Sequence, residues 1–337
     1  MAVANAYKIK HTPGRKTDVI DSEWIAELCL NGMIEPSRIF LREDRELRRL
    51  TRAREGYVND MNRVKNRIHH VLESCGIKLS SVLADIFGKS GRYLLNSLLD
   101  GVSIEEIIEG IPVKRIRKKS DQIKESIKGS LDITQVILIR GGLDQMESIQ
   151  KRIDELESEI RRRVIHQREN IAVLMSVPGI GFISAVTILA EIGDFRDFEK
   201  SEKLAAWCGL VPSVYQSADK LITGSITKHG SRHIRWILVE VAQVVARCGS
   251  PKLKRFFLRI KAKKGYNVAI VALARKILCI LHHLLLNREP YQDEGTKKNV
   301  KIDLEGQEPS VRMSIEDMIK SVVEAGYEVK KKSMMGE

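Results

Sequence analysis

The sequence contains little proline and few aromatic residues. Only 8 prolines and 17 aromatics (7 Phe, 7 Tyr and 3 Trp) occur in 337 residues. A large β-sandwich or barrel normally uses more of both, in its turns and on its sheet faces. The composition therefore predicts a mainly α fold.

Cysteine is scarce as well, and its spacing indicates no particular chemistry. The five cysteines form no CxxC pair and have no histidine at ligand spacing, so neither a zinc site nor a disulfide framework is supported. We expect buried thiols in a reducing compartment. The most apolar stretch, 268–286, contains Arg275 and Lys276, and no apolar signal core follows Met1. We expect a soluble, cytoplasmic protein with no membrane partner.

Negative charge is in deficit. The 57 Lys+Arg exceed the 44 Asp+Glu and give a net charge of +13 and a pI near 9.5. Residues 220–264 hold twelve of the basic residues and a single acidic one, Glu240. A solvated basic face is the alternative, but such faces usually mix both signs, so this stretch predicts salt-sensitive binding to the DNA backbone. The candidate contacts are Lys220, Lys228, Arg232, Arg235, Lys252, Lys254, Arg255 and Lys261.

Apolar residues repeat at helical spacing in two long stretches. One runs from Leu47 to Val71, and the basic residues between its apolar positions, including Arg48 and Arg52, predict a basic exposed side. The other runs from Leu143 to Val164, and the two favour a helical hairpin arm or short coiled coil. The expected regions are 1–40, a helical and coiled-coil region at 41–170, a compact helical domain at 171–290, and a charged tail at 291–337.

A glycine-containing turn precedes a predicted helix that starts near Phe182. Residues 176–188 read SVPGIGFISAVTI, in which Gly179 and Gly181 permit a close approach to another backbone. The start of the helix offers unpaired N–H groups to a phosphate. The segment resembles half of a helix-hairpin-helix DNA clamp; a tight turn without a ligand is the alternative.

Two carboxylates stand close together near the N-terminus. If a helix begins near Thr17, Asp18 and Asp21 are three residues apart and lie on one face. Two such carboxylates can share Mg²⁺, the ion that nucleases use on phosphodiesters. Asp is also favoured in the first turn of any helix by the macrodipole, so the spacing leaves both interpretations open.

Several segments together resemble one known family, in that family's own order, over residues 5–291. They include GRKTDVIDSEW at 14–24, NRIHHVLESCGIKLSSVLADIFGKSGRYLL at 66–95, SVPGIGFISAVTILAEIGD at 176–194, and the stretch 204–242 that begins LAAWCGLVPSVYQSADK. The chain is similar to the DEDD-type transposases of insertion sequences, specifically the insertion-sequence one-ten family, whose better-known members are guided by a bridge RNA.

The resemblance implies a site and partners. Residues 1–40 match the end of a RuvC-like domain of the RNase-H type, in which Asp18 and Asp21 correspond to the last two acids of the DEDD set that holds Mg²⁺. Ser217 matches the serine nucleophile, which forms a phosphoserine-linked DNA end. The family commonly has glycine where this chain has Asp219, so the local loop differs. DNA, a guide (bridge) RNA and a homo-oligomer formed through the helical arm are the implied partners.

The chain departs from this family at its beginning. Only 17 residues precede Asp18 and none is acidic, whereas the family places its first two acids there on strands. A sheet of about five strands cannot be built from so short a segment. We therefore expect a truncated transposase that forms no covalent Ser217–DNA adduct by itself. We also expect a helix at 17–30 whose apolar face, including Ile25 and Leu28, is exposed for want of that sheet.

Two other functions fit the same residues. The first is a noncatalytic nucleic-acid-binding protein derived from such a transposase, acting as a competitor or surviving as a relic. The second is a helical interaction protein whose basic face is incidental. Binding to nucleic acid would distinguish this interaction protein from both the transposase and the noncatalytic binding protein.

Overall fold

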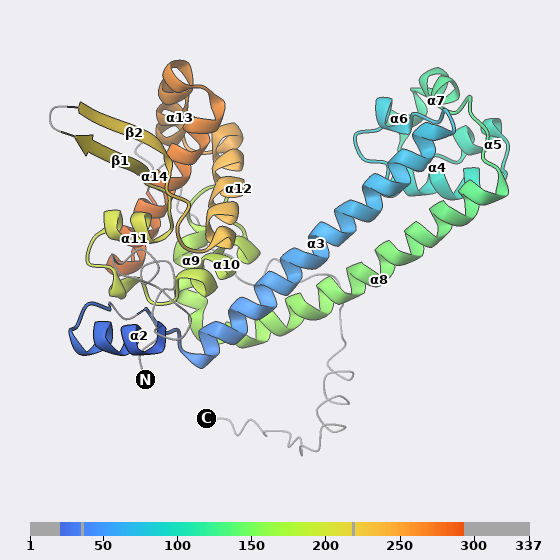
Figure 1. Cartoon of the computed structure of the whole chain (residues 1–337). Coiled ribbons are helices and arrows are strands. Elements are labelled where there is room, and N and C mark those ends of the chain that lie inside the picture. The colour runs from blue at the N-terminus through green and yellow to red at the C-terminus, as the bar shows by residue number, and fades with distance from the viewer. Residues whose placement is uncertain (1–20, 35–36, 218–219, 293–337) are drawn as a thin grey trace, which may run out of the picture. The chain divides into compact units, whose positions relative to one another are not determined.

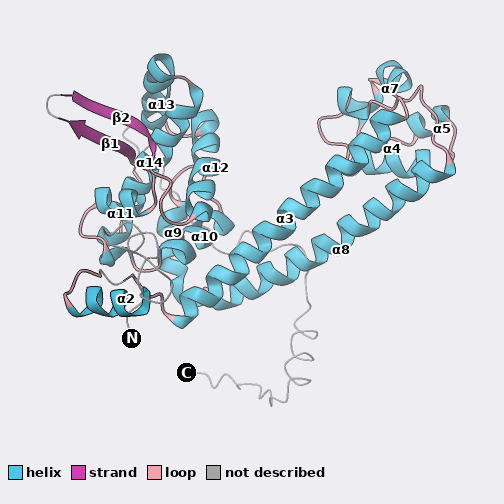
Figure 2. Ribbon diagram, viewed as in Figure 1, coloured by secondary structure: helices cyan, strands magenta, loops and turns pink. Residues whose placement is uncertain are grey.

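In the part of the chain that the structure describes, helices make up nearly all of the regular structure, and one short antiparallel hairpin is the exception (Figure 2). The computed structural model describes residues 21–34, 37–217 and 220–292. The predicted mainly α fold is confirmed. The helices are α2 (Asp21–Leu30), α3 (Arg42–Ser74), α4 (Lys89–Leu99), α5 (Ile104–Glu109), α6 (Lys114–Arg117), α7 (Ser120–Ser126), α8 (Ile133–Arg163), α9 (Arg168–Met175), α10 (Phe182–Ile192), α11 (Ser201–Trp207), α12 (Arg232–Cys248), α13 (Pro251–Lys264) and α14 (Tyr266–Asn287). The strands are β1 (Pro212–Ser217) and β2 (Lys220–Ile226).

Helices α3 and α8 pack along each other in opposite directions, as the two apolar stripes predict (Figure 1). Their buried positions follow helical spacing and face one another across the pair. These positions are Met61, Val64, Ile68 and Leu72 on α3, and Ile139, Met146, Ile149 and Ile153 on α8. Asp132 and Gln135 form a reciprocal capping box at the start of α8 and satisfy N–H groups that the first turn leaves unpaired. The arm is therefore defined by a buried seam and a well-capped second helix.

A cap of short helices, α4 to α7, connects the two helices of the arm. Its apolar side chains, including the fully buried Leu94, Ile107 and Ile123, join the outer half of the α3–α8 seam in one hydrophobic cluster. The backbone N–H of Lys78 donates to the carbonyl of Ser126 at 2.8 Å, which fastens the end of α3 to α7. The cap therefore has a core of its own, shared with the arm.

A second hydrophobic cluster is built around α14, which packs against α9, α11, α12 and α13. By length and composition α14 could cross a membrane. It instead buries Leu273, Ile277 and Leu281 completely among these helices, and the buried His282 lies 2.8 Å from the carbonyl of Phe198. The apolar character of α14 is thus explained by its place in a protein core.

Three expectations differ from the structure. Leu28 of α2 is only 3% exposed, so the predicted exposed apolar face is wrong there, although Ile25 is 38% exposed. Of the five cysteines, all free, Cys29 and Cys248 are exposed, whereas Cys208 is buried and its burial raises its pKa to about 12. The compact region after residue 170, predicted as helical, contains the β1–β2 hairpin. Within 21–34 and 37–120 no strand is present.

Two adjacent glycines of α8 provide a test of the arm seam. A Cβ at Gly142 would lie 2.9 Å from Cγ1 of Ile68, whereas one at Gly141 would meet nothing within 4 Å. Gly142→Leu should therefore lower the free energy of unfolding by about 1–3 kcal/mol through overpacking. Gly141→Leu should raise it by up to about 1 kcal/mol, because it removes a glycine from an exposed helix position. Urea unfolding monitored by circular dichroism measures both; equal effects would contradict the packing described.

Candidate nucleic-acid interface and serine hairpin

Ser217 is the last residue of β1. The strands pair antiparallel, with Gln216 opposite Leu221 and Ser217 opposite Lys220, so two residues, 218 and 219, connect them. The side chains of 214–223 lie outside the described part of the chain. The sequence does not reveal this hairpin, because its strands are short and the two connecting residues, Ala218 and Asp219, are not one of the glycine-containing pairs that mark a two-residue turn.

The base of the hairpin is held by two interlocking glycines. Gly209 and Gly230 both have φ of 70° or more, and a Cβ on either would lie 2.2 Å from a carbonyl oxygen, that of His229 and that of Trp207 respectively. Only glycine fits such a contact. Arg235 also stabilises the base of the hairpin, because its Nη1 donates to the carbonyls of His229 at 2.7 Å and of Gly230 at 3.1 Å. The strand that ends at Ser217 therefore starts from a fixed support.

The Pro-Gly-Ile-Gly turn lies between α9 and α10, and α10 begins at Phe182 as predicted. Gly179 has φ +91°, and a Cβ there would lie 3.0 Å from Cγ2 of Val245, so packing against α12 accounts for this glycine. Gly181 is the N-cap of α10 and faces open space. Beside it, the guanidinium of Arg161 stacks 4.5 Å from the ring centre of Phe182. The start of α10 is therefore accessible and has a cation next to it.

Helix α13 is the most basic element of the candidate interface. Buried Leu253 and Phe257 fix its inner side. Lys254, Arg255 and Lys261 are exposed, and none has a salt bridge with a residue that the structure describes. Of the remaining predicted contacts, Lys228, Arg232 and Lys252 are exposed, Arg235 is half-buried at the hairpin base, and Lys220 begins β2 with its side chain outside the described part.

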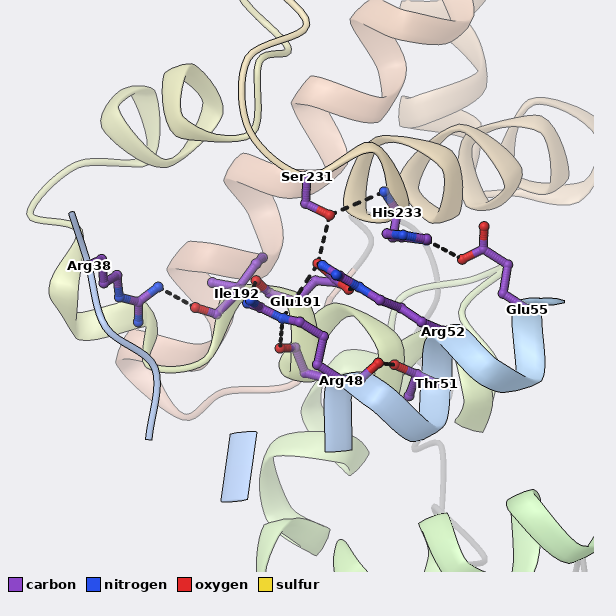
Figure 3. Close-up of polar contacts among 10 residues, drawn as sticks. Arg38, Arg48, Thr51, Arg52, Glu55, Glu191, Ile192, Ser231 and His233 are labelled. Carbon is purple, nitrogen blue, oxygen red and sulfur yellow. Dashed lines mark hydrogen bonds and ion pairs between the residues drawn. The ribbon is translucent and has the colours of Figure 1, made fainter. Parts of the chain in front are cut away.

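A buried carboxylate that the sequence reasoning did not single out lies where α10 meets α3 and the start of α12. Glu191, in the last turn of α10, is fully buried (Figure 3). Arg52 of α3 donates to it in bidentate fashion, from Nε to Oε1 at 2.7 Å and from Nη2 to Oε2 at 2.9 Å. Ser231 donates to Oε2 at 2.7 Å. As the N-cap of α12, its hydroxyl also accepts a hydrogen bond from the backbone N–H of His233. A glutamate inside the apolar run ISAVTILAEI was the available signal, since a buried charge requires partners.

Arginines also cap the carboxyl end of α10. Arg48 donates from Nη2 to the carbonyl of Glu191 at 2.7 Å and from Nε to that of Ala190 at 3.2 Å. Arg38 donates to the carbonyl of Ile192. These carbonyls have no partner within the helix, and cations are favoured at this end of the dipole. The predicted exposed basic side of α3 is therefore wrong at Arg48 and Arg52, whose guanidinium groups face the protein.

The electrostatics of Glu191 follow from these contacts. Burial alone would raise its pKa, but the hydrogen bonds from Arg52 and Ser231 and the charges of Arg48 and Arg52 outweigh it and hold the pKa below its ordinary value. Nearby, Nδ1 of His233 lies 2.6 Å from Oε2 of Glu55 of α3, so α12 meets the arm at a second polar contact. Helices α3, α10 and α12 are therefore joined through charged and polar side chains.

The predicted metal ligands are placed only in part. Asp21 is the first residue of α2, with its side chain outside the described part, and Asp18 lies outside the described residues. No group of three or more His, Cys, Asp or Glu side chains in the described ranges could hold a metal ion. The described residues therefore complete no ligand set for Mg²⁺.

Comparison with protein families identifies the class of protein. A family model described as "Transposase IS116/IS110/IS902 family" matches residues 171–258, and a DEDD-type model of the IS110 group, described as "Transposase", matches residues 1–77. Both matches thus identify a transposase with a DEDD domain, a class that acts on DNA and whose DEDD acids imply metal-dependent catalysis. The chain belongs to the IS116/IS110/IS902 family.

Individual relatives agree with this assignment. The chain is 26% identical over 293 residues to a "Probable family 20 transposase" of Pseudomonas aeruginosa, which covers 86% of this chain and 78% of the relative. It is 33% identical over 143 residues to the transposase of insertion sequence element IS1111A of Coxiella burnetii, with 42% of this chain and 39% of the relative covered. It is 30% identical over 122 residues to a "Pilin gene-inverting protein" of Moraxella bovis, with 36% and 38% covered.

The buried carboxylate gives a test of the junction between α3, α10 and α12. Glu191→Gln keeps the size of the side chain but removes the charge that Arg48 and Arg52 require. We expect the free energy of unfolding at neutral pH to fall by about 2–4 kcal/mol, less than for a fully buried pair because Arg52 is partly exposed. Exposed Glu240→Gln should change it by less than about 0.5 kcal/mol. Urea unfolding monitored by tryptophan fluorescence measures both.

The difference should also depend on pH with a defined sign. Because the pKa of Glu191 is lowered in the folded state, its stabilisation is present above the unfolded pKa and is lost as pH falls through the folded pKa. The gap between wild type and Glu191→Gln should therefore be constant at neutral pH and shrink under acid conditions. Equal stabilities at neutral pH would contradict the network.

Proposed function

We propose that the protein cleaves and rejoins DNA during insertion-sequence transposition through a serine–DNA intermediate at Ser217. The observation that supports this most strongly is that Ser217 lies inside the family match at 171–258, at the end of a strand whose base is locked by Gly209, Gly230 and Arg235. A nucleophile must be held within about 1 Å of its productive position. A strand rising from a rigid base meets that requirement better than a free loop.

The proposed step is a transesterification. The Ser217 oxygen attacks phosphorus, a serine O–P bond forms, and the bond from phosphorus to one deoxyribose oxygen breaks. The serine proton passes to a base, and the departing sugar oxygen takes up a proton. Attack by a sugar hydroxyl on the phosphoserine reverses the sequence and joins the new DNA ends. One phosphodiester bond is conserved throughout, so the reaction needs no external energy source.

Asp18 and Asp21 are proposed as Mg²⁺ ligands. Carboxylate oxygens are the donors this ion prefers, and when bound it would stabilise charge on the phosphoryl oxygens. The DEDD-type match at 1–77 includes both aspartates. The described residues by themselves complete no ligand set for this ion.

The basic surface is proposed to hold the DNA. Lys254, Arg255 and Lys261 of α13 would neutralise backbone phosphates, and the accessible start of α10 beside Arg161 would accept another. A guide RNA is proposed as a second nucleic-acid partner. A homo-oligomer through the arm is proposed as well, supported by Ile133, Ile137 and Leu138 of α8, each more than half exposed.

Trapping of the intermediate tests the proposed function. The reading frame is expressed with its native upstream DNA retained, so that any preceding codons are included, and incubated with donor DNA, Mg²⁺ and any required guide RNA. We expect a protein–DNA band that survives denaturing electrophoresis and disappears in Ser217→Ala, because alanine has no hydroxyl. Ser213→Ala, four residues earlier on β1, is the matched control and should retain the band.

Two results would change the assignment. A band that persists in Ser217→Ala would move the nucleophile elsewhere. No band from any protein, together with intact DNA binding, would favour the noncatalytic nucleic-acid-binding protein. The same assay on residues 1–337 tests the expectation that this chain by itself gives no adduct.

The salt dependence of binding tests the α13 surface. Replacing Lys254, Arg255 and Lys261 together by Gln should flatten the slope of log K against log salt for duplex DNA by roughly one unit for each phosphate that is no longer neutralised. Replacing Lys151, Lys200 and Lys203 by Gln removes the same charge from other exposed positions and should leave the slope unchanged. Fluorescence anisotropy titrations provide the constants; identical slopes for the α13 variant and the wild type would place the DNA elsewhere.

A further inference from the structure

The cap at the end of the arm has a basic segment of its own. Between residues 114 and 119, every side chain except that of Ile116 is basic, and none is acidic. The segment comprises α6 and the two residues after it, and it precedes α7. Ile116 is half-buried and packs against the hydrophobic cluster of the cap, which orients the segment.

Two of these basic residues hold the segment in place. Arg117 donates from Nη2 to the carbonyl of Ile111 at 2.8 Å, and Lys119 donates from Nζ to the carbonyl of Val82 at 3.3 Å. The side chains of Lys114, Arg115 and Lys118 are exposed and form no hydrogen bond or salt bridge with any residue in the described ranges. The segment is thus a fixed support that presents three positively charged side chains to solvent.

The arginines of the neighbouring helix α8 differ from this segment. Single exposed cations elsewhere on the arm, Arg67 and Lys151 among them, also form no salt bridge with a described residue, but in the segment 114–119 three such cations lie within five residues. Each arginine of α8 has a partner: Arg140 pairs with Asp100, Arg152 with Glu155, Arg162 and Arg163 with Glu159, and Arg161 stacks on Phe182. A surface that serves only for solubility usually interleaves both signs in this way. Lys114, Arg115 and Lys118 lack such partners, which indicates a site for an external anion.

This cluster is separate from the α13 surface. Helix α3 meets α10 near its beginning, through Arg48 and Arg52, and reaches the cap at its end, where Lys78 bonds to Ser126. Its 33 residues span about 50 Å. That length exceeds the Debye length in physiological salt, about 8 Å, by several fold, so the two basic surfaces act on different phosphates.

We propose that Lys114, Arg115 and Lys118 form a second nucleic-acid-binding surface, which contacts the phosphate backbone of a duplex at the end of the arm. The residue types favour phosphate over an acidic protein surface. Protein interfaces have a buried aromatic or apolar centre and are depleted of lysine, whereas the large apolar side chain exposed in 112–119 is Val113, at 38%. Backbone contacts need only mobile cations on a fixed support.

Salt-dependent binding by the full chain tests this proposal. The variant Lys114→Gln, Arg115→Gln, Lys118→Gln is compared with wild type on DNA and RNA duplexes of about 40 base pairs, long enough to extend along the arm, at about 50–200 mM salt. We expect the slope of log K against log salt to flatten by roughly two to three units on at least one duplex, near 0.9 per phosphate. A flatter slope on only one duplex identifies DNA or RNA as the ligand.

Two controls make the result decisive. Replacement of Lys151, Lys200 and Lys203 by Gln removes equal charge and should leave both slopes unchanged, and all variants should unfold at the temperature of the wild type because the substituted side chains are exposed. The cap variant is also combined with substitution of Lys254, Arg255 and Lys261, and its effect should persist there. Slopes equal to those of wild type on both duplexes would overturn the proposal, whatever the α13 variant shows.

Discussion

The carboxylate of Glu191 is completely buried, and side chains from α3 and from the start of α12 supply the hydrogen bonds and positive charge that a buried carboxylate requires. Arg52 of the arm and Ser231 at the start of α12 both donate hydrogen bonds to this carboxylate. Arg48 donates to the backbone carbonyl of Glu191 in the same helix turn. Separation of the three helices would leave the carboxylate of Glu191 without its partners Arg52 and Ser231, which is energetically costly for a buried charge. Glu191 and Ser231 lie in the family match at 171–258 and Arg48 and Arg52 in the match at 1–77, so this contact joins the two matched regions physically.

Positive charge therefore has two separate uses in this protein. Arg38, Arg48 and Arg52 face inward, where planar guanidinium groups satisfy carbonyls and a carboxylate with several directed hydrogen bonds. The cations of α13, and Lys114, Arg115 and Lys118 of the segment 114–119, face solvent, and most of them are lysines, whose mobile ammonium groups suit contacts to a backbone without fixed geometry. The net charge of the chain counts both groups alike, although only the second is available to a polyanion.

The sequence predicts the helices whose apolar residues recur at a regular spacing, but it does not predict features that depend on a single contact. Apolar spacing locates α3 and α8, and the Pro-Gly-Ile-Gly turn locates the start of α10, because burial of a helix face imposes a regular period. The inward direction of Arg48 depends on contacts with Ala190 and Glu191, which are distant in sequence and which no local pattern encodes. The β1–β2 hairpin is local, but no glycine-containing turn pair marks it in the sequence. Within the candidate site, Asp18, Asp21 and Ser217 are assigned from the family resemblance. The contacts of Gly209, Gly230 and Arg235 that support the strand of Ser217 are known only from the structure.

The base of the hairpin has a consequence for how its reach can change. Gly209 and Gly230 leave no space for a side chain, so substitutions there disturb the support itself, whereas the Ser217–Lys220 pair stands at the opposite end of the two strands. Successive residues of a strand point to opposite faces. Lengthening both strands by two residues would carry position 217 farther outward on the same face, whereas lengthening them by one would turn it to the other. The distance of position 217 from the hairpin base can therefore change by two residues per strand at a time without a change in the face to which its side chain belongs.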